Sequence, residues 1–209
     1  MTRRGFTLIE MLVVVGIIMI LLGASITAFS KMTRTAEKTR AIELVKNVEV
    51  ALTAIFQEKG VWPQRLIIGA QGDHRLDEEA AFALKDKMSL TVDNGQLAGL
   101  DKFGIVTPWA TTAIKRAGRN AASADSIKVG SHTVKDHILY YALDLNGDGV
   151  IRNNEAPTIG GERVAIRATA AVWCVGKDGG DNGKPWPYSR GERMGDIYSW
   201  TAGQTQDAQ

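Results

Sequence analysis

The sequence predicts an α+β protein in which one long N-terminal α-helix packs on a small antiparallel β-sheet. Two observations predict the helix: an apolar run at residues 6–29, and apolar residues that then recur at intervals of three and four up to residue 58. A third observation predicts the sheet, because short β-prone runs separated by turn residues follow from residue 137 onward. With 209 residues, the chain is long enough for one core-bearing domain and an accessory segment.

The first half of the predicted helix, residues 6–29, has the length and composition of a membrane-spanning segment. About 20 consecutive apolar residues are enough to cross a hydrocarbon core as a helix. Arg3 and Arg4 precede the run, and basic residues favour the cytoplasmic side of a membrane. Glu10 interrupts the apolar pattern, and a lone carboxylate costs about 3 kcal/mol in the middle of a bilayer and less near its surface. Glu10 therefore needs a partner or a role.

Two simpler interpretations of this segment leave Glu10 unexplained. A secretory signal peptide would use Arg3 and Arg4 as its basic region and would be cut near residues 23–25. The apolar pattern, however, continues past Ala28 instead of ending at a processing site. A plain transmembrane anchor has the right length, but it gives the acidic residue no purpose.

The residues that surround Glu10, Arg-Gly-Phe-Thr-Leu-Ile-Glu at 4–10, resemble the prepilin processing site shared by type IV pilins and type II secretion pseudopilins. The resemblance implies that residues 1–5 are a leader, that a prepilin peptidase cuts between Gly5 and Phe6 on the cytoplasmic side, and that Phe6 is then N-methylated. The helix would stay in the membrane until it enters a filament. There, Glu10 of one subunit can neutralise the Phe6 amine of its neighbour, because leaving either charge alone in an apolar core costs several kcal/mol.

The second half of the helix, residues 30–59, is amphipathic. Lys, Arg and Glu separate the members of a single apolar stripe, which comprises Ala41, Leu44, Val45, Val48, Ala51, Leu52 and Ile55. Gly60 and Pro63 supply a stop signal, so a helix that begins at Phe6 would be roughly 80 Å long. The Gly-Val-Trp-Pro junction at 60–63 also resembles the aromatic-proline step that follows the long helix in pseudopilins.

The remaining chain divides into three parts by composition. Residues 60–136 form a variable region with a short helix predicted at 77–88 and loops elsewhere. Residues 137–200 carry the predicted antiparallel sheet, with β-prone runs at 138–143 and 164–175. Residues 201–209 are polar and predict a flexible, frayed tail. Together with the helix, these parts predict an α+β head, and the resemblance at residues 4–10 implies that this head is pilin-like.

A twelve-residue segment that follows the first predicted strand fits the EF-hand calcium pattern. Gly149 takes the sharp bend, and the oxygen donors are Asp144, Asn146, Asp148, the Val150 carbonyl and Glu155. Calcium binds 6–8 oxygen ligands, so donors at every second residue can form a cage. The alternative is a β-hairpin turn, because Asn-Gly and Asp-Gly between strands are strong hairpin signals. Glu155 at the bidentate position favours calcium.

A second glycine-rich segment, residues 176–183, is followed by Gly-Asp-Ile-Tyr-Ser-Trp at 195–200. This arrangement resembles the C-terminal region of the major pseudopilin of type II secretion, in which a Gly-x-Asp-Gly loop and a later Asp-Ile-x-Ser-Trp stretch hold calcium. The resemblance implies that Asp178 and Asp196 are ligands. The insertion around residues 185–187 departs from the family pattern and leaves the carbonyl ligands open. A solvated glycine-rich turn is the alternative.

Charge and composition support neither nucleic-acid binding nor catalysis. Lys and Arg number 25 against 23 Asp and Glu, and the net charge of +2 gives no reason to expect an acidic partner. No zinc-ligand spacing and no catalytic motif includes the three histidines, His74, His132 and His137. Cys174 lies in an apolar β pattern and predicts a small buried side chain. We therefore expect a protein that is not an enzyme and has no nucleic-acid partner.

These features together predict a structural subunit of a type II secretion pseudopilus that supports protein export. The implied partners are prepilin peptidase and methyltransferase, further copies of the chain, other pseudopilins or pilins, and an inner-membrane assembly platform. The expected location is the inner membrane, single-pass with the head in the periplasm, before assembly into a periplasmic or extracellular filament.

Two other functions fit parts of the sequence. One is a type IV pilin, including a minor one, for adhesion, motility or DNA uptake; the other is a membrane-anchored calcium-binding enzyme or module. Type IV major pilins commonly clamp the C-terminal region with a disulfide, and a chain with a single cysteine cannot form one internally. The absent disulfide and the two candidate calcium loops favour the pseudopilin.

Overall fold

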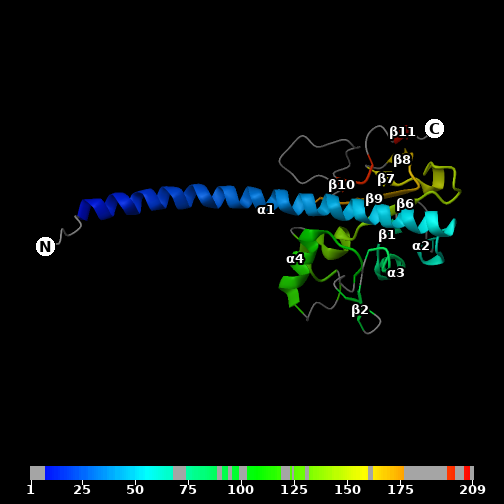
Figure 1. Cartoon of the computed structure of the whole chain (residues 1–209), viewed down its shortest axis with the longest axis horizontal. Helices are drawn as coiled ribbons and strands as arrows, with labels where there is room; N and C mark the ends of the chain where they lie inside the picture. The colour runs from blue at the N-terminus through cyan, green and yellow to red at the C-terminus, as the bar shows by residue number, and fades with distance from the viewer. Residues whose placement is uncertain are drawn as a thin grey trace. The chain divides into compact units, whose positions relative to one another are not determined.

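The structure, a computed structural model, describes residues 8–67, 74–88, 91–93, 96–98, 103–118, 123, 125–129, 132–159, 162–176, 197–200 and 205–207. It divides into two compact units, Met1–Thr39 and Arg40–Gln209. Helix α1 (Leu8–Lys59) supplies the described part of the first unit and opens the second (Figure 1).

Helix α1 confirms the predicted continuous helix and its stop signal. It ends at Lys59, and Gly60 follows with φ +67°. The Gly60 N–H donates to the Phe56 carbonyl at 2.7 Å, which satisfies one of the last helical acceptors. Glycine adopts this left-handed conformation without steric cost, and the nearby Pro63 prevents the helix from resuming at once.

The second unit contains the other elements, which are labelled in chain order in Figure 1. The helices are α2 (Gln64–Ile67), α3 (Glu78–Ala83), α4 (Pro108–Ala117) and the 3-10 turns η2 (Val134–His137) and η3 (Asn153–Glu155). The strands are β1 (His74–Arg75), β2 (Thr91–Asp93), β3 (Gln96–Ala98), β4 (Lys128–Val129), β5 (His132–Thr133), β6 (Tyr140–Leu143), β7 (Thr158–Ile159), β8 (Glu162–Ile166), β9 (Ala170–Cys174), β10 (Ile197–Tyr198) and β11 (Thr205–Asp207).

The predicted antiparallel sheet is confirmed, with strand order β1-β6-β9-β10. Its centre is the β6–β9 pair, in which Tyr140 lies opposite Trp173 and Leu143 opposite Ala170. The edge strand β1 comes from the region that the sequence assigns to loops and a short helix. That strand was missed because a two-residue segment has no periodicity to detect.

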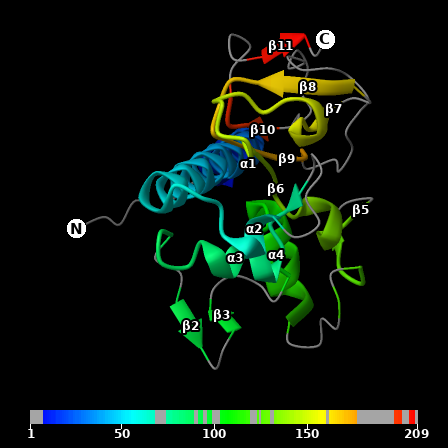
Figure 2. The same cartoon turned by 90° about the vertical axis from the view of Figure 1, so that its right-hand side faces the viewer.

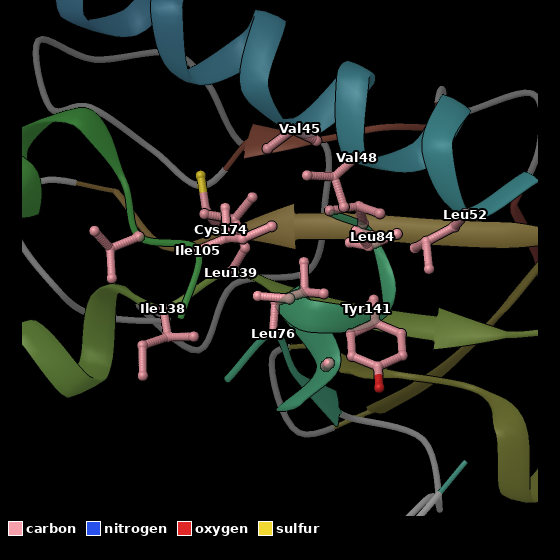
Figure 3. Close-up of a cluster of buried hydrophobic side chains, with 14 of the residues drawn as sticks. Val45, Val48, Leu52, Leu76, Leu84, Ile105, Ile138, Leu139, Tyr141 and Cys174 are labelled. Carbon is pink, nitrogen blue, oxygen red and sulfur yellow. The ribbon is translucent and has the colours of Figure 1, made fainter. Parts of the chain in front are cut away.

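The amphipathic stripe of α1 packs on this sheet, as the sequence predicts. Six of its members are at most 4% exposed: Ala41, Val45, Val48, Ala51, Leu52 and Ile55. Leu44 is partly buried at the edge of the same cluster. Figure 3 shows Val45, Val48 and Leu52 reaching from α1 into the cluster, whose other labelled members are Leu76, Leu84, Ile105, Ile138, Leu139, Tyr141 and Cys174. The apolar face of α1 thus covers one side of the hydrophobic core.

Strand β9 is buried on both faces, which makes the sheet a middle layer. Ala170, Val172 and Cys174 belong to the cluster under α1, and the alternate residues Ala171 and Trp173 belong to a second cluster. The other buried members of the second cluster are Ala142, Ile151, Ile166 and Trp200. Cys174 is 0% exposed, which confirms its prediction as a small buried side chain.

A three-stranded sheet, ordered β11-β8-β7, lies on the far side of β9 from α3 and α4 (Figure 2). It corrects two expectations. The β-prone run at 164–175 forms two strands, β8 and β9, because the chain bends at residues 167–169. Residues 205–207, predicted to be part of a frayed tail, instead form β11 opposite Val164, Ala165 and Ile166. An edge strand offers unpaired backbone groups, and β11 pairs with those of β8.

The helices of the variable region are partly as expected. The helix predicted at 77–88 is present but shorter: α3 covers Glu78–Ala83, and residues 84–88 form turns. The Asp77 side chain accepts the Ala80 N–H at 3.0 Å and so caps its first turn. Helix α4 was not predicted, although Pro108 at its start and Gly118 at its end are recognised helix boundary residues. The short pairs β2–β3 and β4–β5 were not predicted either.

Candidate functional site

The predicted processing site lies at the start of the chain. Gly5 and Phe6 are outside the described residues, so the cut and the methylation stay predictions. Glu10 lies in the first turn of α1 with an exposed side chain. A carboxylate at this end of a helix is favoured by the partial positive charge of the helix N-terminus.

The first part of α1 presents a long apolar surface. Its described large apolar side chains from Leu8 to Leu22 are each at least 49% exposed. An apolar surface of this extent marks a membrane or protein contact. Within the described part of the chain, no helix meets the length and hydropathy required of a membrane span.

The candidate calcium segment, Asp144–Glu155, connects two different sheets. Strand β6 pairs with β1 and β9, whereas β7, the next strand along the chain, pairs with β8. The hairpin alternative is therefore wrong, because the strands before and after the segment are not partners. Instead, Ile151 forms an isolated bridge with Ile166, and the segment ends in η3.

Asp144 organises the first turn of this loop. Asp144 is 1% exposed, although the neighbouring residues 145–149 are exposed. One oxygen, Oδ1, accepts the N–H groups of Gly147 at 2.8 Å and Asp148 at 3.3 Å, and Oδ2 accepts the N–H of Gly149 at 2.7 Å. The buried carboxylate thus orders the loop through three backbone donors.

Removing this carboxylate should destabilise the head even without a metal. We expect Asp144→Ala to lower the free energy of unfolding by on the order of 2–3 kcal/mol in the presence of a chelator, because three N–H groups lose their acceptor. Urea unfolding of the full chain in detergent measures the change. Asp86→Ala, an exposed aspartate outside the loop, serves as control and should be near neutral. A value for Asp144→Ala that equals the control would contradict the structural role.

Asn146 and Asp148 each accept a hydrogen bond from a backbone N–H two residues further along the loop. Asn146 Oδ1 accepts the Asp148 N–H at 2.9 Å, and Asp148 Oδ1 accepts the Val150 N–H at 2.9 Å. Gly147 and Gly149 have φ of +75° and +82°, which side chains rarely adopt. Gly149 therefore makes the bend that the calcium pattern requires at this position.

Glu155 returns to the loop from its far end. Its Oε1 accepts the Leu145 N–H at 3.1 Å, while the buried Oε2 has no hydrogen-bond partner within the described structure. Burial, together with the nearby charges of Asp144 and Asp148, raises the pKa of Glu155 above its ordinary value. A cation at this place would relieve both the lost solvation and the repulsion between the carboxylates.

The donor set suits a hard cation, but its carboxylates are not gathered around one point. Three carboxylates, one amide oxygen and one backbone carbonyl are all oxygen ligands of the kind that calcium prefers. Among the described residues, no three Asp, Glu, His or Cys side chains converge closely enough to hold a metal ion. The second oxygen of Asp148 is taken by the Arg152 guanidinium, which donates to Oδ2.

Trp62 and Phe56 lie beside the loop, although no sequence pattern links them to it. Trp62 contacts the loop directly, and Phe56 stacks on Trp62. Trp62 donates its Nε1–H to the Asp144 carbonyl at 2.6 Å and stacks on Phe56 with ring centroids 4.8 Å apart. A Cβ atom added at Gly147 would lie 4.0 Å from Cζ of Phe56. No local pattern predicts a bond between residues 82 positions apart, although the conspicuous Trp-Pro step after α1 marks the place.

The predicted ligands of the second candidate loop, Asp178 and Asp196, lie outside the part of the chain that the structure describes, so their role stays a prediction. The stretch that follows them is described in part: Ser199 Oγ accepts the Val172 N–H at 3.0 Å, and Trp200 is 3% exposed. The end of this motif is thus anchored on β9.

Comparisons with known proteins agree with the N-terminal motif. Residues 1–26 match the prokaryotic N-terminal methylation motif. The type IV major pilin protein PilE1 of Neisseria gonorrhoeae is 32% identical over 95 residues, which cover 44% of this chain and 41% of that protein. The chain is type IV pilin-like.

Other relatives of the pilin-like chain align over a shorter segment. The fimbrial protein EcpC of Eikenella corrodens is 33% identical over 29% of this chain and 40% of its own length. A fimbrial protein of Neisseria meningitidis is 34% identical over 29% of this chain and 36% of its own. The pilin-like chain thus spans about two fifths of the length of these relatives. No solved structure matches it.

Proposed function

We propose that this chain is a structural subunit of a type II secretion pseudopilus, a filament that supports protein export. The observation that carries the proposal is the methylation motif at residues 1–26, which continues into a helix with exposed apolar side chains from Leu8 to Leu22. Such a surface is stable against lipid or against other apolar helices. A subunit that moves from a membrane into a filament core needs this property.

The proposed maturation begins with a prepilin peptidase that cuts after Gly5. Methylation of the new Phe6 amine follows, and the helix remains as a single pass in the inner membrane with the head in the periplasm. An assembly platform then moves the subunit into a homopolymer that includes other pseudopilins. In the filament, Glu10 of one subunit pairs with the Phe6 amine of a neighbour and so sets the axial register.

Glu10→Val tests this pairing. We expect the variant to be cleaved and methylated as usual, since Gly5 and Phe6 are unchanged, but its incorporation into filaments should fall by at least about tenfold. Intact mass measures processing, and the ratio of subunit in sheared filaments to subunit in membranes measures assembly.

Glu43→Val is the matched control, because it removes an exposed charge from the same helix outside the first turn. Its effect on assembly should be small. Normal incorporation of Glu10→Val, or equal defects in both variants, would contradict the register role.

A type IV pilin, including a minor one, is the second candidate, and the pilin and fimbrial relatives favour it. The single cysteine and the candidate calcium loops favour the pseudopilus, because calcium can stabilise C-terminal loops where a disulfide is impossible. Deletion of the gene in the native host, with complementation, separates the two. Loss of protein export with normal surface filaments supports the pseudopilus, and loss of surface filaments with normal export supports the pilin.

We further propose that the loop Asp144–Glu155 binds calcium. Its ligands would be the side chains of Asp144, Asn146, Asp148 and Glu155 with the Val150 carbonyl. Binding would require the three carboxylates, which are not gathered around one point in the described structure, to close around the ion. The support is the donor chemistry and the buried Glu155 Oε2. The second loop, with Asp178 and Asp196, is a further calcium proposal that depends on the family resemblance.

Calcium removal should therefore lower the thermal stability of the full chain in detergent. At a calcium concentration about 100 times the Kd, binding adds about 2.7 kcal/mol, so a chelator should lower Tm by roughly 5–10 °C. Asp148→Ala should lose most of the response that belongs to this loop, whereas the exposed Asp86→Ala should keep it. A Tm that does not respond to chelator would contradict calcium binding by both loops, which would then be ordinary turns.

A further inference from the structure

We propose that His137 is a pH-sensitive anchor of helix α4: its neutral imidazole holds the first turn of the helix on the core, and protonation in acid releases that turn. The inference concerns the head alone and does not depend on the proposed pseudopilus or on calcium. It begins from a contact between two buried side chains on different elements, Trp109 of α4 and His137 of η2.

The hydrogen bond between these two residues fixes the state of the imidazole. The Trp109 Nε1–H donates to His137 Nδ1 at 3.0 Å, and an indole nitrogen can only donate. His137 Nδ1 must therefore accept, so the ring is neutral and carries its hydrogen on Nε2. Both nitrogens of a protonated imidazole are donors, so a proton on Nδ1 would face the indole N–H and break this bond.

The surroundings of His137 also oppose a positive charge. His137 is 0% exposed and Trp109 is 2% exposed, so a charged imidazole would lose its hydration. Trp109 is the second residue of α4, so the imidazole lies beside the end of the helix that carries a partial positive charge. The hydrogen bond, the burial and the helix end thus all favour the neutral ring.

The charged neighbours of His137 do not offset these costs. The adjacent Asp136 uses its Oδ2 to accept the Thr133 N–H at 2.9 Å and the Thr133 hydroxyl at 2.8 Å. The Thr133 N–H is the main cause that lowers the pKa of Asp136, and attraction to His137 is the smallest cause. The other described charged or titratable side chains on η2 and on the segments around it are mostly cations: His132, Lys128, Lys135 with its ion-pair partner Asp125, and Lys115 and Arg116 in the last turn of α4.

His137 holds α4 by its backbone as well as by its side chain. The Thr107 N–H, directly before α4, donates to the His137 carbonyl at 3.0 Å. In the first turn Trp109 and Ala110 are buried, and Ala113 and Ile114 in the next turn pack against the same cluster. Loss of the side-chain bond therefore weakens the attachment of the apolar face of α4.

His74 is a second buried histidine, and it makes the head acid-sensitive at another place. Burial lowers the pKa of His74, and the charge of Asp77 opposes this shift. The His74 ring packs against Tyr141 of β6, with ring centroids 5.1 Å apart. A variant of His74 therefore separates general acid sensitivity from release of α4.

The test measures hydrogen exchange of the α4 amides in the full chain in detergent, corrected for the intrinsic exchange rate at each pH. A released histidine binds a proton with a pKa of about 6.5, so the attachment is complete above this pH and weakens below it. We expect the protection of α4 to fall by up to about thirtyfold between about pH 7.5 and pH 5, the ratio for one histidine that is protonated only when released.

His137→Asn is the decisive variant, because its Oδ1 can replace Nδ1 as acceptor of the Trp109 N–H but cannot titrate. It should lose most of the pH response of α4. His132→Asn and His74→Asn should keep that response, since neither residue bonds to Trp109 in the described structure.

A response of α4 in His137→Asn that equals the wild-type response would overturn the proposal, and so would wild-type protection that is the same at both pH values. Equal losses of response in His137→Asn and His132→Asn would overturn it as well. Trp109→Phe gives an independent measurement if His137→Asn does not fold. It removes the indole N–H but keeps an aromatic ring, so α4 should be less protected at neutral pH and respond less to acid. A full wild-type response in Trp109→Phe would also contradict the proposal.

Discussion

A chain that carries Gly5→Trp is expected to accumulate as the full-length precursor. The family resemblance places the scissile bond directly after Gly5, and we expect a large side chain at this position to keep a peptidase from approaching the backbone closely. Without cleavage the Phe6 amine is never formed, so Glu10 has no positive charge to meet in a neighbouring subunit. Processing and assembly should therefore fail together.

Intact mass of the membrane fraction measures this result. The wild-type protein should begin at Phe6 and carry one methyl group, and Gly5→Trp should retain residues 1–5 without it. Gly16→Trp makes the same change in size further along α1, where a Cβ atom meets nothing within 4 Å, and it should be processed. A mature N-terminus at Phe6 in the Gly5 variant would remove the inference drawn from the motif.

The second half of α1 shows which parts of the fold can be read from sequence. Its stripe from Ala41 to Ile55 has a period that only one helix face satisfies, and all its residues are buried except Leu44, which is partly buried. The stop at Gly60 was also predicted, because glycine past a helix end has a known conformational reason. Both predictions depend on local patterns alone.

The elements that were missed depend on partners distant in the sequence. Strand β1 has two residues and exists because Arg75 lies opposite Tyr140 of β6. Strand β11 is polar and exists because β8 has an edge to pair with. Neither has a period of its own.

In the candidate calcium loop, too, the features with a local sequence spacing were predicted and the contact with a distant residue was not. The donors from Asp144 to Glu155 follow a fixed spacing and were predicted from it. Trp62, which holds the Asp144 carbonyl, was not associated with the loop, because only the folded chain brings it there. Arg152 could have been noticed, since a cation at the ninth position departs from the pattern.

Gly104→Ala should cost more stability than any other single substitution considered for the head. Gly104 has φ +99°, and a Cβ atom there would lie 2.1 Å from the Leu76 carbonyl oxygen and 2.7 Å from the Asp77 Cα. Both neighbours are backbone atoms, so no side chain can rotate away. Either the backbone around Gly104 moves away from Leu76 and Asp77, or the variant remains strained.

The separation would break a closed set of backbone hydrogen bonds in the core. The Ile105 N–H donates to the Leu76 carbonyl at 2.9 Å, the Leu76 N–H to the Leu139 carbonyl at 2.8 Å, and the Leu139 N–H to the Ile105 carbonyl at 2.9 Å. All three residues are 0% exposed, so a broken bond cannot be replaced by water at once. We expect a loss of on the order of 4 kcal/mol or more in the free energy of unfolding.

Gly60→Ala separates the cost of a left-handed backbone conformation from the cost of the steric clash with Leu76 and Asp77. Gly60 also has a left-handed φ, +67°, but a Cβ atom there meets nothing within 4 Å. It should lose only the conformational cost of about 1 kcal/mol, so the difference between the variants isolates the close approach to Leu76. Urea unfolding of the full chain in detergent measures both, and limited proteolysis detects a Gly104 variant that fails to fold. Equal losses would mean that the backbone at Leu76 can move aside, and that these three segments are less tightly joined than their hydrogen bonds indicate.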